Sequence, residues 1–166
     1  GLRQTNPGND EGLMLPYFDA EIVPHVATPG VIRQNLDPHN AAANVRAVIE
    51  AQALSSRIHA EWMGVNVQSI SVTGGASANA EILQVFADVH DCEVQQFQTT
   101  NAAALGAALR ASHDHMTALG TPVTWPQTVS DFSRPLPGSD IQPRAQTVTL
   151  YDERLEAYRD LEARHT

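Results

Sequence analysis

The residues with the clearest potential for chemistry are Thr73-Gly74-Gly75-Ala76, which join a predicted strand to a predicted helix. Polar and apolar residues alternate from Ser69 to Thr73, as in a strand, and the apolar residues from Ile82 onward take helical spacing. Two consecutive glycines let the backbone turn tightly and let a ligand approach without a Cβ in the way. The helix that follows offers unpaired N–H groups and a partial positive charge. The junction therefore has the features of a nucleotide-binding loop.

The glycines alone leave a second interpretation open, because strand-Gly-Gly-helix junctions also occur as plain structural turns. No Gly-Lys-Ser/Thr follows, as a Walker loop requires, and the dinucleotide fingerprint Gly-x-Gly-x-x-Gly is absent. On spacing alone, ligand contact and a structural turn both stand.

Two further groupings of reactive side chains predict no site. The run from His113 to His115 is the one tight histidine cluster, but side chains two apart on a helix do not face each other and no cysteine accompanies them. Ser77, Asp88 and His90 have the residue types of a nucleophile, an orienting acid and a base, yet the Gly-x-Ser-x-Gly elbow is missing. We therefore assign no metal ligand and no catalytic residue.

The longer string around the glycines is more specific than the glycines themselves. Gly74 to Asn79 reads Gly-Gly-Ala-Ser-Ala-Asn, and Ile-Leu-Gln follows at Ile82. This string resembles the adenosine-side motif of the FGGY carbohydrate kinases, in which the glycines and the asparagine contact the adenosine part of ATP. The resemblance implies a nucleotide-binding set of Gly74, Gly75, Ala76 and Asn79. Many members begin the motif with three glycines, and here Thr73 takes the first place.

Three other stretches resemble motifs of the same family, so the resemblance covers about residues 12 to 111. They are Leu15-Pro16-Tyr17 with Glu21 and Pro24-His25, Arg46-Ala47-Val48-Ile49-Glu50, and Ala104-Leu105-Gly106-Ala107-Ala108. Three positions depart from the usual family residues, with Gln34, Asn44 and Asn101 in place of Gly, His and Glu.

By this resemblance the chain is identified as part of the C-terminal lobe of an FGGY kinase, closest to the xylulokinases. The implied reaction is ATP-dependent phosphorylation of a ketopentose, D-xylulose to D-xylulose 5-phosphate, with ATP and Mg²⁺. The family's catalytic aspartate and sugar pocket lie in its N-terminal lobe. We therefore expect this chain to contact ATP or ADP, to meet the sugar only through that lobe, and to be inactive alone. An FGGY kinase for glycerol or ribulose, a non-catalytic nucleotide-binding fragment and a homodimer remain alternatives.

Length and composition restrict the partners further. A chain of 166 residues suffices for one domain with a sizeable core. Its net charge of −9 repels phosphate backbones, so nucleic acid is not an expected partner. The sequence contains no run of 18 apolar residues, so we expect no membrane-spanning segment and no membrane partner. The single Cys92, expected to be buried in a strand, suits a reducing compartment, so the predicted location is cytoplasmic.

The elements that position the loop can be predicted in chain order. Within residues 1–29, Pro16, Pro24 and Pro29 fix φ and cannot donate to a ladder, so we expect a long ordered loop. Residues 30–36 read as a short strand. A long helix should then begin with Asp37 as its N-cap and run to Met63.

The pattern within that long helix predicts which faces are covered. Its buried stripe is expected to comprise Ala47, Ala51, Leu54, Ile58 and Trp62, with Gly64 as the left-handed residue after its end. Another face carries two i,i+4 pairs, Arg46 with Glu50 and Arg57 with Glu61, each worth about 0.2–0.5 kcal/mol if exposed.

The remaining elements alternate in type. We expect a strand at 91–97, a helix from about Asn101 to Ala111 capped by Thr99 or Thr100, a Pro-rich wrap over 119–146 and an amphipathic helix at 148–163. This alternation predicts α/β architecture. The resemblance implies a partial ribonuclease-H-like (actin-like ATPase) lobe, with helices flanking a mixed sheet and a C-terminal helix. We assign residues 1–118 to the lobe portion and 119–166 to a wrap and helix of the same domain.

Overall fold

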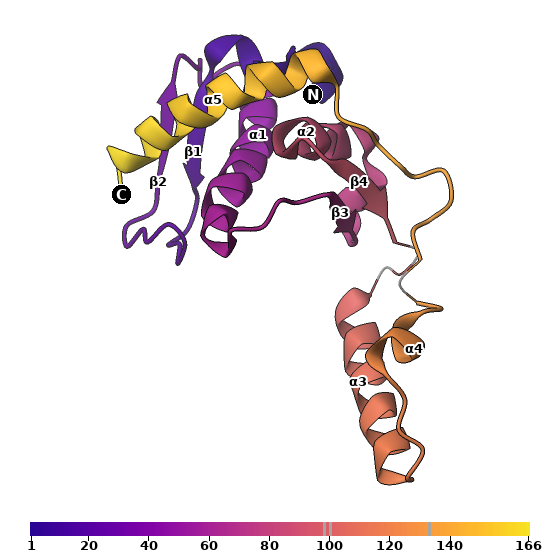
Figure 1. Ribbon diagram of the computed structural model, residues 1–166. Helices are drawn as coiled ribbons and strands as arrows, with labels where there is room; N and C mark the ends of the chain where they lie inside the picture. The colour runs from indigo at the N-terminus through magenta and orange to yellow at the C-terminus, as the bar shows by residue number, and fades with distance from the viewer. Residues whose placement is uncertain (98, 100, 133) are drawn as a thin grey trace.

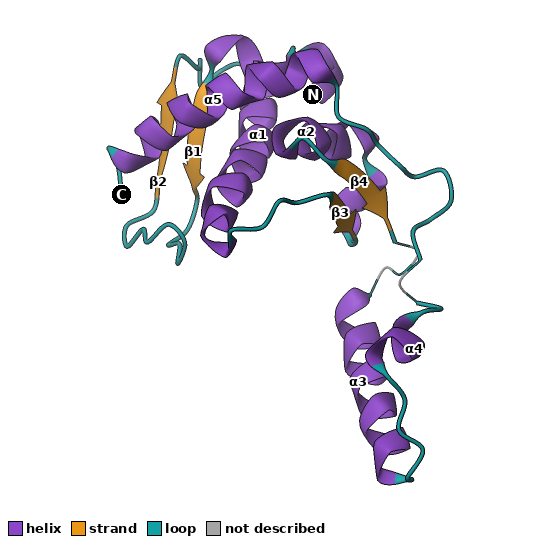
Figure 2. Ribbon diagram, in the orientation of Figure 1, coloured by secondary structure: helices purple, strands orange, loops and turns teal. Residues whose placement is uncertain are grey.

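The computed structural model describes residues 1–97, 99, 101–132 and 134–166. The strands are β1 (Leu13–Tyr17), β2 (Gly30–Gln34), β3 (Ser69–Val72) and β4 (Glu93–Gln96). The helices are α1 (Ala41–Ala60), α2 (Ala80–His90), α3 (Ala102–Ala118), α4 (Trp125–Val129) and α5 (Ala145–Ala163). Short 3₁₀ helices are η1 (Leu2–Gln4), η2 (Pro7–Glu11), η3 (Glu61–Met63) and η4 (Gly75–Ala78). The predicted α/β class is confirmed, and the strands described form two separate two-stranded sheets (Figure 2).

The first sheet corrects the expectation of a long loop over residues 1–29. β1 and β2 pair antiparallel, from Leu13 opposite Gln34 to Tyr17 opposite Gly30. Pro16 lies inside β1, because a two-stranded antiparallel ladder directs every second N–H away from the partner strand and tolerates a proline there. The inward residues of β1 supply a continuous part of the core.

The start of α1 differs from the prediction by one turn. Asp37 does not cap the helix, since its carboxylate accepts a hydrogen bond from the His39 N–H at 2.9 Å in a local turn. The N-cap is Asn40, whose side chain accepts from the Ala43 N–H at 3.1 Å. Both residues have short polar side chains, and the one that faces the first free amides of the helix takes the role.

The end of α1 confirms Gly64 and corrects Trp62. Gly64 adopts φ 62°, the left-handed conformation that was predicted. The α-helix, however, stops at Ala60 and tightens into η3, which changes the direction of the following side chains. Trp62 is consequently 83% exposed and contributes nothing to the core. The other four members of the predicted stripe, Ala47, Ala51, Leu54 and Ile58, are buried.

The core lies between the first sheet and helices α1, α2 and α5. Figure 1 shows α5 running across β1, α1 and α2, which brings the C-terminal helix next to the start of the chain. The predicted apolar face of α5 is confirmed, because Tyr151, Leu155, Tyr158 and Leu161 are all buried. The main cluster of buried residues comprises Leu13, Leu15, Tyr17, Val26, Ala51, Ala53, Leu54, Ile58, Val85, Val89, Tyr151, Leu155, Tyr158 and Leu161.

The helices α3 and α4 project away from this core (Figure 1). Asn101 caps α3 by accepting from the Ala104 N–H at 3.2 Å, so the predicted Thr99 cap is wrong, and Thr100 lies outside the described residues. A Cβ added at Gly106 in the middle of α3 would meet no atom within 4 Å, so no close packing requires a glycine there. The two helices contact each other through the rings of His113 and Trp125, which stack with centroids 4.3 Å apart.

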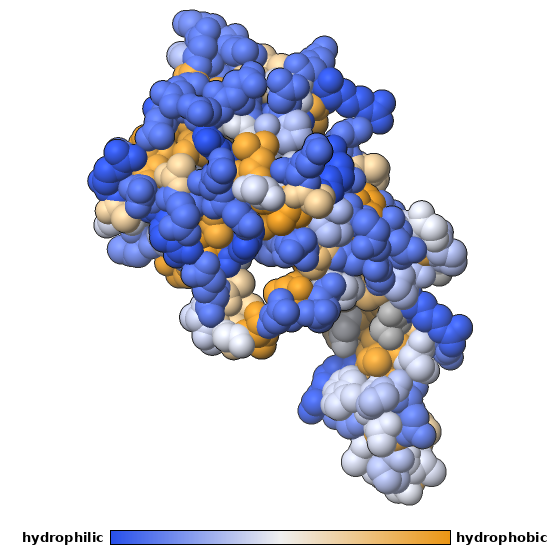
Figure 3. Space-filling view, turned by 45° about the horizontal axis from the view of Figure 1, so that its top comes forward, coloured by the Kyte–Doolittle hydropathy of each residue, from blue (hydrophilic) through white to orange (hydrophobic). Residues whose placement is uncertain are grey.

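The second sheet is extended by the Pro-rich segment. β3 and β4 pair parallel, and Val94 of β4 also forms an antiparallel bridge with Ile141. A second bridge joins Phe97 and Pro135. The division into residues 1–118 and 119–166 stays a prediction. The surface in Figure 3 is mostly hydrophilic with scattered apolar patches, and none of the helices in the described ranges is both long and apolar enough to cross a bilayer.

Candidate functional site

The glycine corner follows directly after β3. Gly74 has φ 94° and ψ −174°, a conformation that is almost restricted to glycine. The chain then forms η4 and reaches Asn79, which is the N-cap of α2. A Cβ added at Gly74 or Gly75 would meet no atom within 4 Å, so the corner opens to solvent and is not buried beneath its own side chains. The structure therefore brings the four predicted nucleotide-binding residues together on one exposed loop.

Side-chain hydrogen bonds help to hold this loop in place. The Ser77 hydroxyl donates to the Gly74 carbonyl at 2.6 Å and closes the turn. The Thr73 hydroxyl donates to the Thr99 carbonyl at 2.8 Å, which ties the end of β3 to the segment after β4. The side-chain amide of Gln96 donates to the Ser77 carbonyl at 2.6 Å. Thr73, which replaces the usual first glycine, thus has a structural role.

The corner presents donors that could bind a nucleotide. Within the described part of the chain, the backbone N–H groups of Gly75 and Ala76 have no hydrogen-bond acceptor. Asn79 accepts a hydrogen bond from the Glu81 N–H through its Oδ1 at 3.0 Å. This bond leaves the Nδ2 of Asn79 available as a donor to a ligand. The positive end of α2 adds a partial charge at the same place. The loop can therefore donate to a purine, a ribose or a phosphate oxygen.

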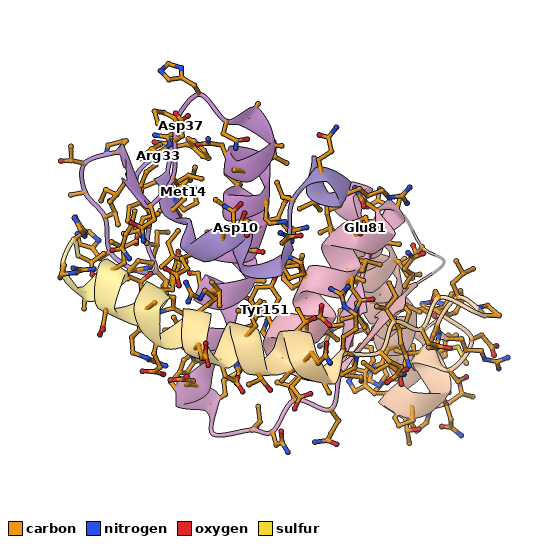
Figure 4. The ribbon with its side chains drawn as sticks, turned by 90° about the horizontal axis from the view of Figure 1, so that it is seen from above. Asp10, Met14, Arg33, Asp37, Glu81 and Tyr151 are labelled. Atoms are coloured by element: carbon orange, nitrogen blue, oxygen red, sulfur yellow. The ribbon has the colours of Figure 1, made fainter. Side chains whose placement is uncertain are left out.

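Two charged residues beside the corner could not be assigned from sequence. Glu81 lies in the first turn of α2 (Figure 4), where a carboxylate would repel a phosphate. The Arg3 guanidinium lies 3.0 Å from the Glu81 carboxylate (Nε to Oε1) and offsets that charge. Arg3 and Glu81 lie far apart in sequence, so this ion pair could not be predicted from the sequence. Only the fold places η1 against α2.

The other reactive groupings do not assemble into a site. The buried Asp88 carboxylate accepts from the Arg144 backbone N–H at 2.8 Å and from Gln84 Nε2 at 2.9 Å, at the start of α5. His90 Nε2 instead lies 2.9 Å from the Ser56 hydroxyl. No group of three or more His, Cys, Asp or Glu side chains placed to hold a metal ion is found in the described ranges. We accordingly assign Mg²⁺ to no residue of this chain.

His90 gives the chain a testable pH dependence. Burial, assisted by the nearby Arg57 charge, lowers the pKa of His90 to about 4. Between about pH 6.5 and 4 the unfolded chain binds a proton at His90 that the folded chain does not. The contribution of His90 to the free energy of unfolding is therefore fully present above about pH 6.5 and is lost on acidification. Because the ring is partly accessible, we expect a loss of only about 1–2 kcal/mol.

Urea unfolding at pH 7 and at pH 4.5 measures this effect. The variant His90→Gln should lose about 1–2 kcal/mol less on acidification than the unmodified chain. The exposed His115 serves as the matched control, since His115→Gln should leave the acid sensitivity unchanged. Equal acid sensitivity in all three proteins would contradict the assignment.

Comparison with known proteins places this geometry in a family. Residues 4–115 match the FGGY family of carbohydrate kinases, C-terminal domain. The chain therefore belongs to the FGGY family of carbohydrate kinases. The xylulose kinase of Rattus norvegicus is 37% identical over 172 residues, covering 98% of this chain and 31% of that protein. The chain thus spans about a third of the length of the curated relative that it matches.

Solved structures support the fold assignment. A ligand-bound xylulose kinase of Lactobacillus acidophilus superposes with a TM-score of 0.80 at 18% identity, over 98% of this chain and 33% of the other. A gluconate kinase of the same organism gives a TM-score of 0.81 at 17% identity, over 98% and 32%. At these identities the likeness concerns the fold, which is the actin-like ATPase fold of the FGGY kinases. The two names give different substrates, xylulose and gluconate, at nearly equal TM-scores, so the fold alone does not identify the substrate.

Proposed function

We propose that this chain forms the adenosine side of the ATP site of a sugar kinase that converts D-xylulose to D-xylulose 5-phosphate. The observation that carries the proposal is the open glycine corner, with Gly74, Gly75, Ala76 and Asn79 in one loop at the start of α2. Family membership supplies the reaction class, ATP-dependent transfer of a phosphate to a carbohydrate hydroxyl.

The corner suits an adenosine for three reasons. The missing side chain at Gly74 and Gly75 leaves room for a flat base or a ribose to reach the backbone. The free amides of Gly75 and Ala76 donate hydrogen bonds, and adenosine offers ring nitrogens and ribose oxygens as acceptors. Asn79 can cap α2 with its oxygen and donate to the nucleoside with its nitrogen, so one residue serves helix and ligand together.

D-Xylulose is favoured by sequence similarity rather than by the fold. The alignment with the rat xylulose kinase extends over nearly the whole chain, including α5. The solved relatives of similar fold carry different sugar names, so the fold is neutral on this choice. We assign the sugar pocket and the catalytic base to another lobe of the kinase. In phosphoryl transfer of this class, Mg²⁺ neutralises the phosphate charge and a carboxylate base accepts the hydroxyl proton.

Calorimetric titration with ADP tests the proposal directly. We expect the chain to bind ADP weakly, and Asn79→Ala to weaken binding about fivefold to tenfold through loss of one hydrogen bond to the nucleoside. The purified chain should transfer no phosphate to D-xylulose, because it contributes one side of the ATP site only.

A matched variant separates ligand contact from helix capping. Asn40→Ala removes the same kind of N-cap from α1, where Asn40 accepts from the Ala43 N–H at 3.1 Å, and should leave ADP affinity unchanged. If Asn79→Ala retained full affinity, or if both variants lost it equally, the proposed role of the corner would be wrong.

A further inference from the structure

A cavity lies apart from the glycine corner, beside the loop that follows β1. It measures about 450 Å³, is open to solvent on one side, and is lined by residues from the segment 16–24, from α1 and from α5. Its walls are mainly apolar and aromatic, with Phe18, Val23, Ala51 and Tyr158 among them. A volume of this size is typical of sites for small molecules. None of the residues of the proposed adenosine site contributes to it.

Polar side chains also line the cavity, and a buried carboxylate lies next to two of them. His59 lines the cavity, and its Nε2 lies 3.0 Å from the Glu162 carboxylate (Oε2). The Tyr17 hydroxyl donates to the other oxygen of Glu162 at 3.3 Å. The Glu162 side chain is only 8% exposed, so this carboxylate is committed to its two neighbours.

The outer end carries negative charge without compensation. Asp19 and Glu21 line the cavity and are exposed, and in the ranges that the structure describes neither forms an ion pair. No arginine is among the residues that line the cavity, although the chain holds ten basic residues. Besides burial, the charges of Glu162 and Glu21 raise the pKa of Tyr17, which indicates that both carboxylates act on the same volume.

We propose that this cavity binds a small organic cation, an ammonium group carried on an aromatic or aliphatic body. The apolar walls suit the body of such a ligand, and the faces of aromatic side chains attract a cation. Asp19 and Glu21 line the cavity and are exposed, so charge complementarity favours a cation over a neutral or an anionic molecule of the same shape. A nucleotide would be repelled here, so this site is independent of the proposed kinase function.

A series of matched probes tests the charge preference. The probes are 2-phenylethylammonium, the neutral 2-phenylethanol and the anionic phenylacetate, each titrated into the isotopically labelled chain and followed by NMR. We expect the ammonium probe to bind at least about fivefold more tightly than the alcohol, and the anion more weakly than either. Shifts of the signals of Val23, Ala51 and Tyr158 should report the location.

Two double variants of equal net charge complete the test. Asp19→Asn with Glu21→Gln should reduce the affinity for the ammonium probe about fivefold to tenfold and leave the alcohol unaffected. Asp114→Asn with Asp131→Asn removes two exposed carboxylates from the α3 and α4 region and should change neither affinity. Equal binding of ammonium and alcohol, equal effects of the two double variants, or shifts confined to other parts of the chain would overturn the proposal.

Discussion

Replacing Glu50 with alanine is expected to lower the free energy of unfolding by about 3–5 kcal/mol. The side chain is buried together with Arg46, the residue one helical turn before it, and their Oε1 and Nη1 atoms lie 3.1 Å apart. Removing the carboxylate would leave the arginine charge buried without its partner. The substitution would also remove the acceptor of two further hydrogen-bond donors, Gly8 and Tyr151, which adds to the loss of stability.

These two donors come from the N-terminal segment and from α5, and both reach one oxygen of the Glu50 carboxylate on α1. The Gly8 N–H donates to Glu50 Oε1 at 2.9 Å, and the Tyr151 hydroxyl, which reaches from α5 (Figure 4), donates to the same atom at 2.7 Å. Arg46 in turn donates to the Leu2 carbonyl at 2.6 Å. Burial, opposed by these hydrogen bonds, raises the pKa of Glu50. The N-terminal segment, α1 and α5 are thus joined through Glu50.

A second glutamate on the same helical run provides the control. Glu61 pairs with Arg159 of α5 at 2.8 Å, but both side chains are substantially exposed. Glu61→Ala should therefore cost less than about 1 kcal/mol. Denaturant unfolding of both variants measures the difference. Equal stability losses in Glu50→Ala and Glu61→Ala would show that the buried network contributes no more than a surface ion pair.

Replacing Gly74 with valine is expected to weaken ADP binding at least about thirtyfold. A valine cannot adopt φ 94° with ψ −174° without strain of about 1–3 kcal/mol, and the loop would relax by turning the Gly75 and Ala76 amides away from their present directions. The loss should appear in ADP affinity more than in the global unfolding transition, because the corner is exposed and contributes nothing to the core. Titration calorimetry and thermal unfolding of the same sample separate the two.

Gly120→Val is the matched control for backbone strain. Gly120 also has a positive φ, 76°, and a Cβ there would meet no atom within 4 Å, but it lies beyond α3 and outside the corner. This variant should retain the ADP affinity of the unmodified chain. Full affinity in Gly74→Val would contradict the proposed contact, and a similar loss in Gly120→Val would attribute it to general strain.

The elements with strong periodicity could be predicted from sequence. The apolar face of α5, marked by Tyr151 and Tyr158, and most of the buried stripe of α1 follow from helical spacing alone. The corner between β3 and α2 was equally accessible, because a glycine pair flanked by a period-2 and a period-3.6 pattern has few alternatives. Its open geometry at Gly74 confirms that the loop is free of its own side chains, while its contact with a nucleotide stays a proposal.

The errors arose where distant segments decide the environment. The burial of Arg46 and Glu50 could not be predicted, since the i,i+4 spacing is the same on either face of a helix, and only the packing of η2 and α5 buries the pair. The second pair did not form at all. Arg57 was expected to pair with Glu61, but its Nη1 lies 2.8 Å from the Asp152 carboxylate of α5. β1 was missed because a proline usually argues against a strand, although a two-stranded sheet accommodates it.

NMR on the ¹⁵N-labelled chain titrated with ADP can show whether the corner from Gly74 to Asn79 receives the adenosine of a nucleotide. We expect saturable shifts that are largest at the amides of Gly75 and Ala76 and at the side-chain amide of Asn79, and that are reduced in Gly74→Val. Saturable shifts centred on another part of the chain, or no saturable shift at millimolar ADP, would contradict this proposal.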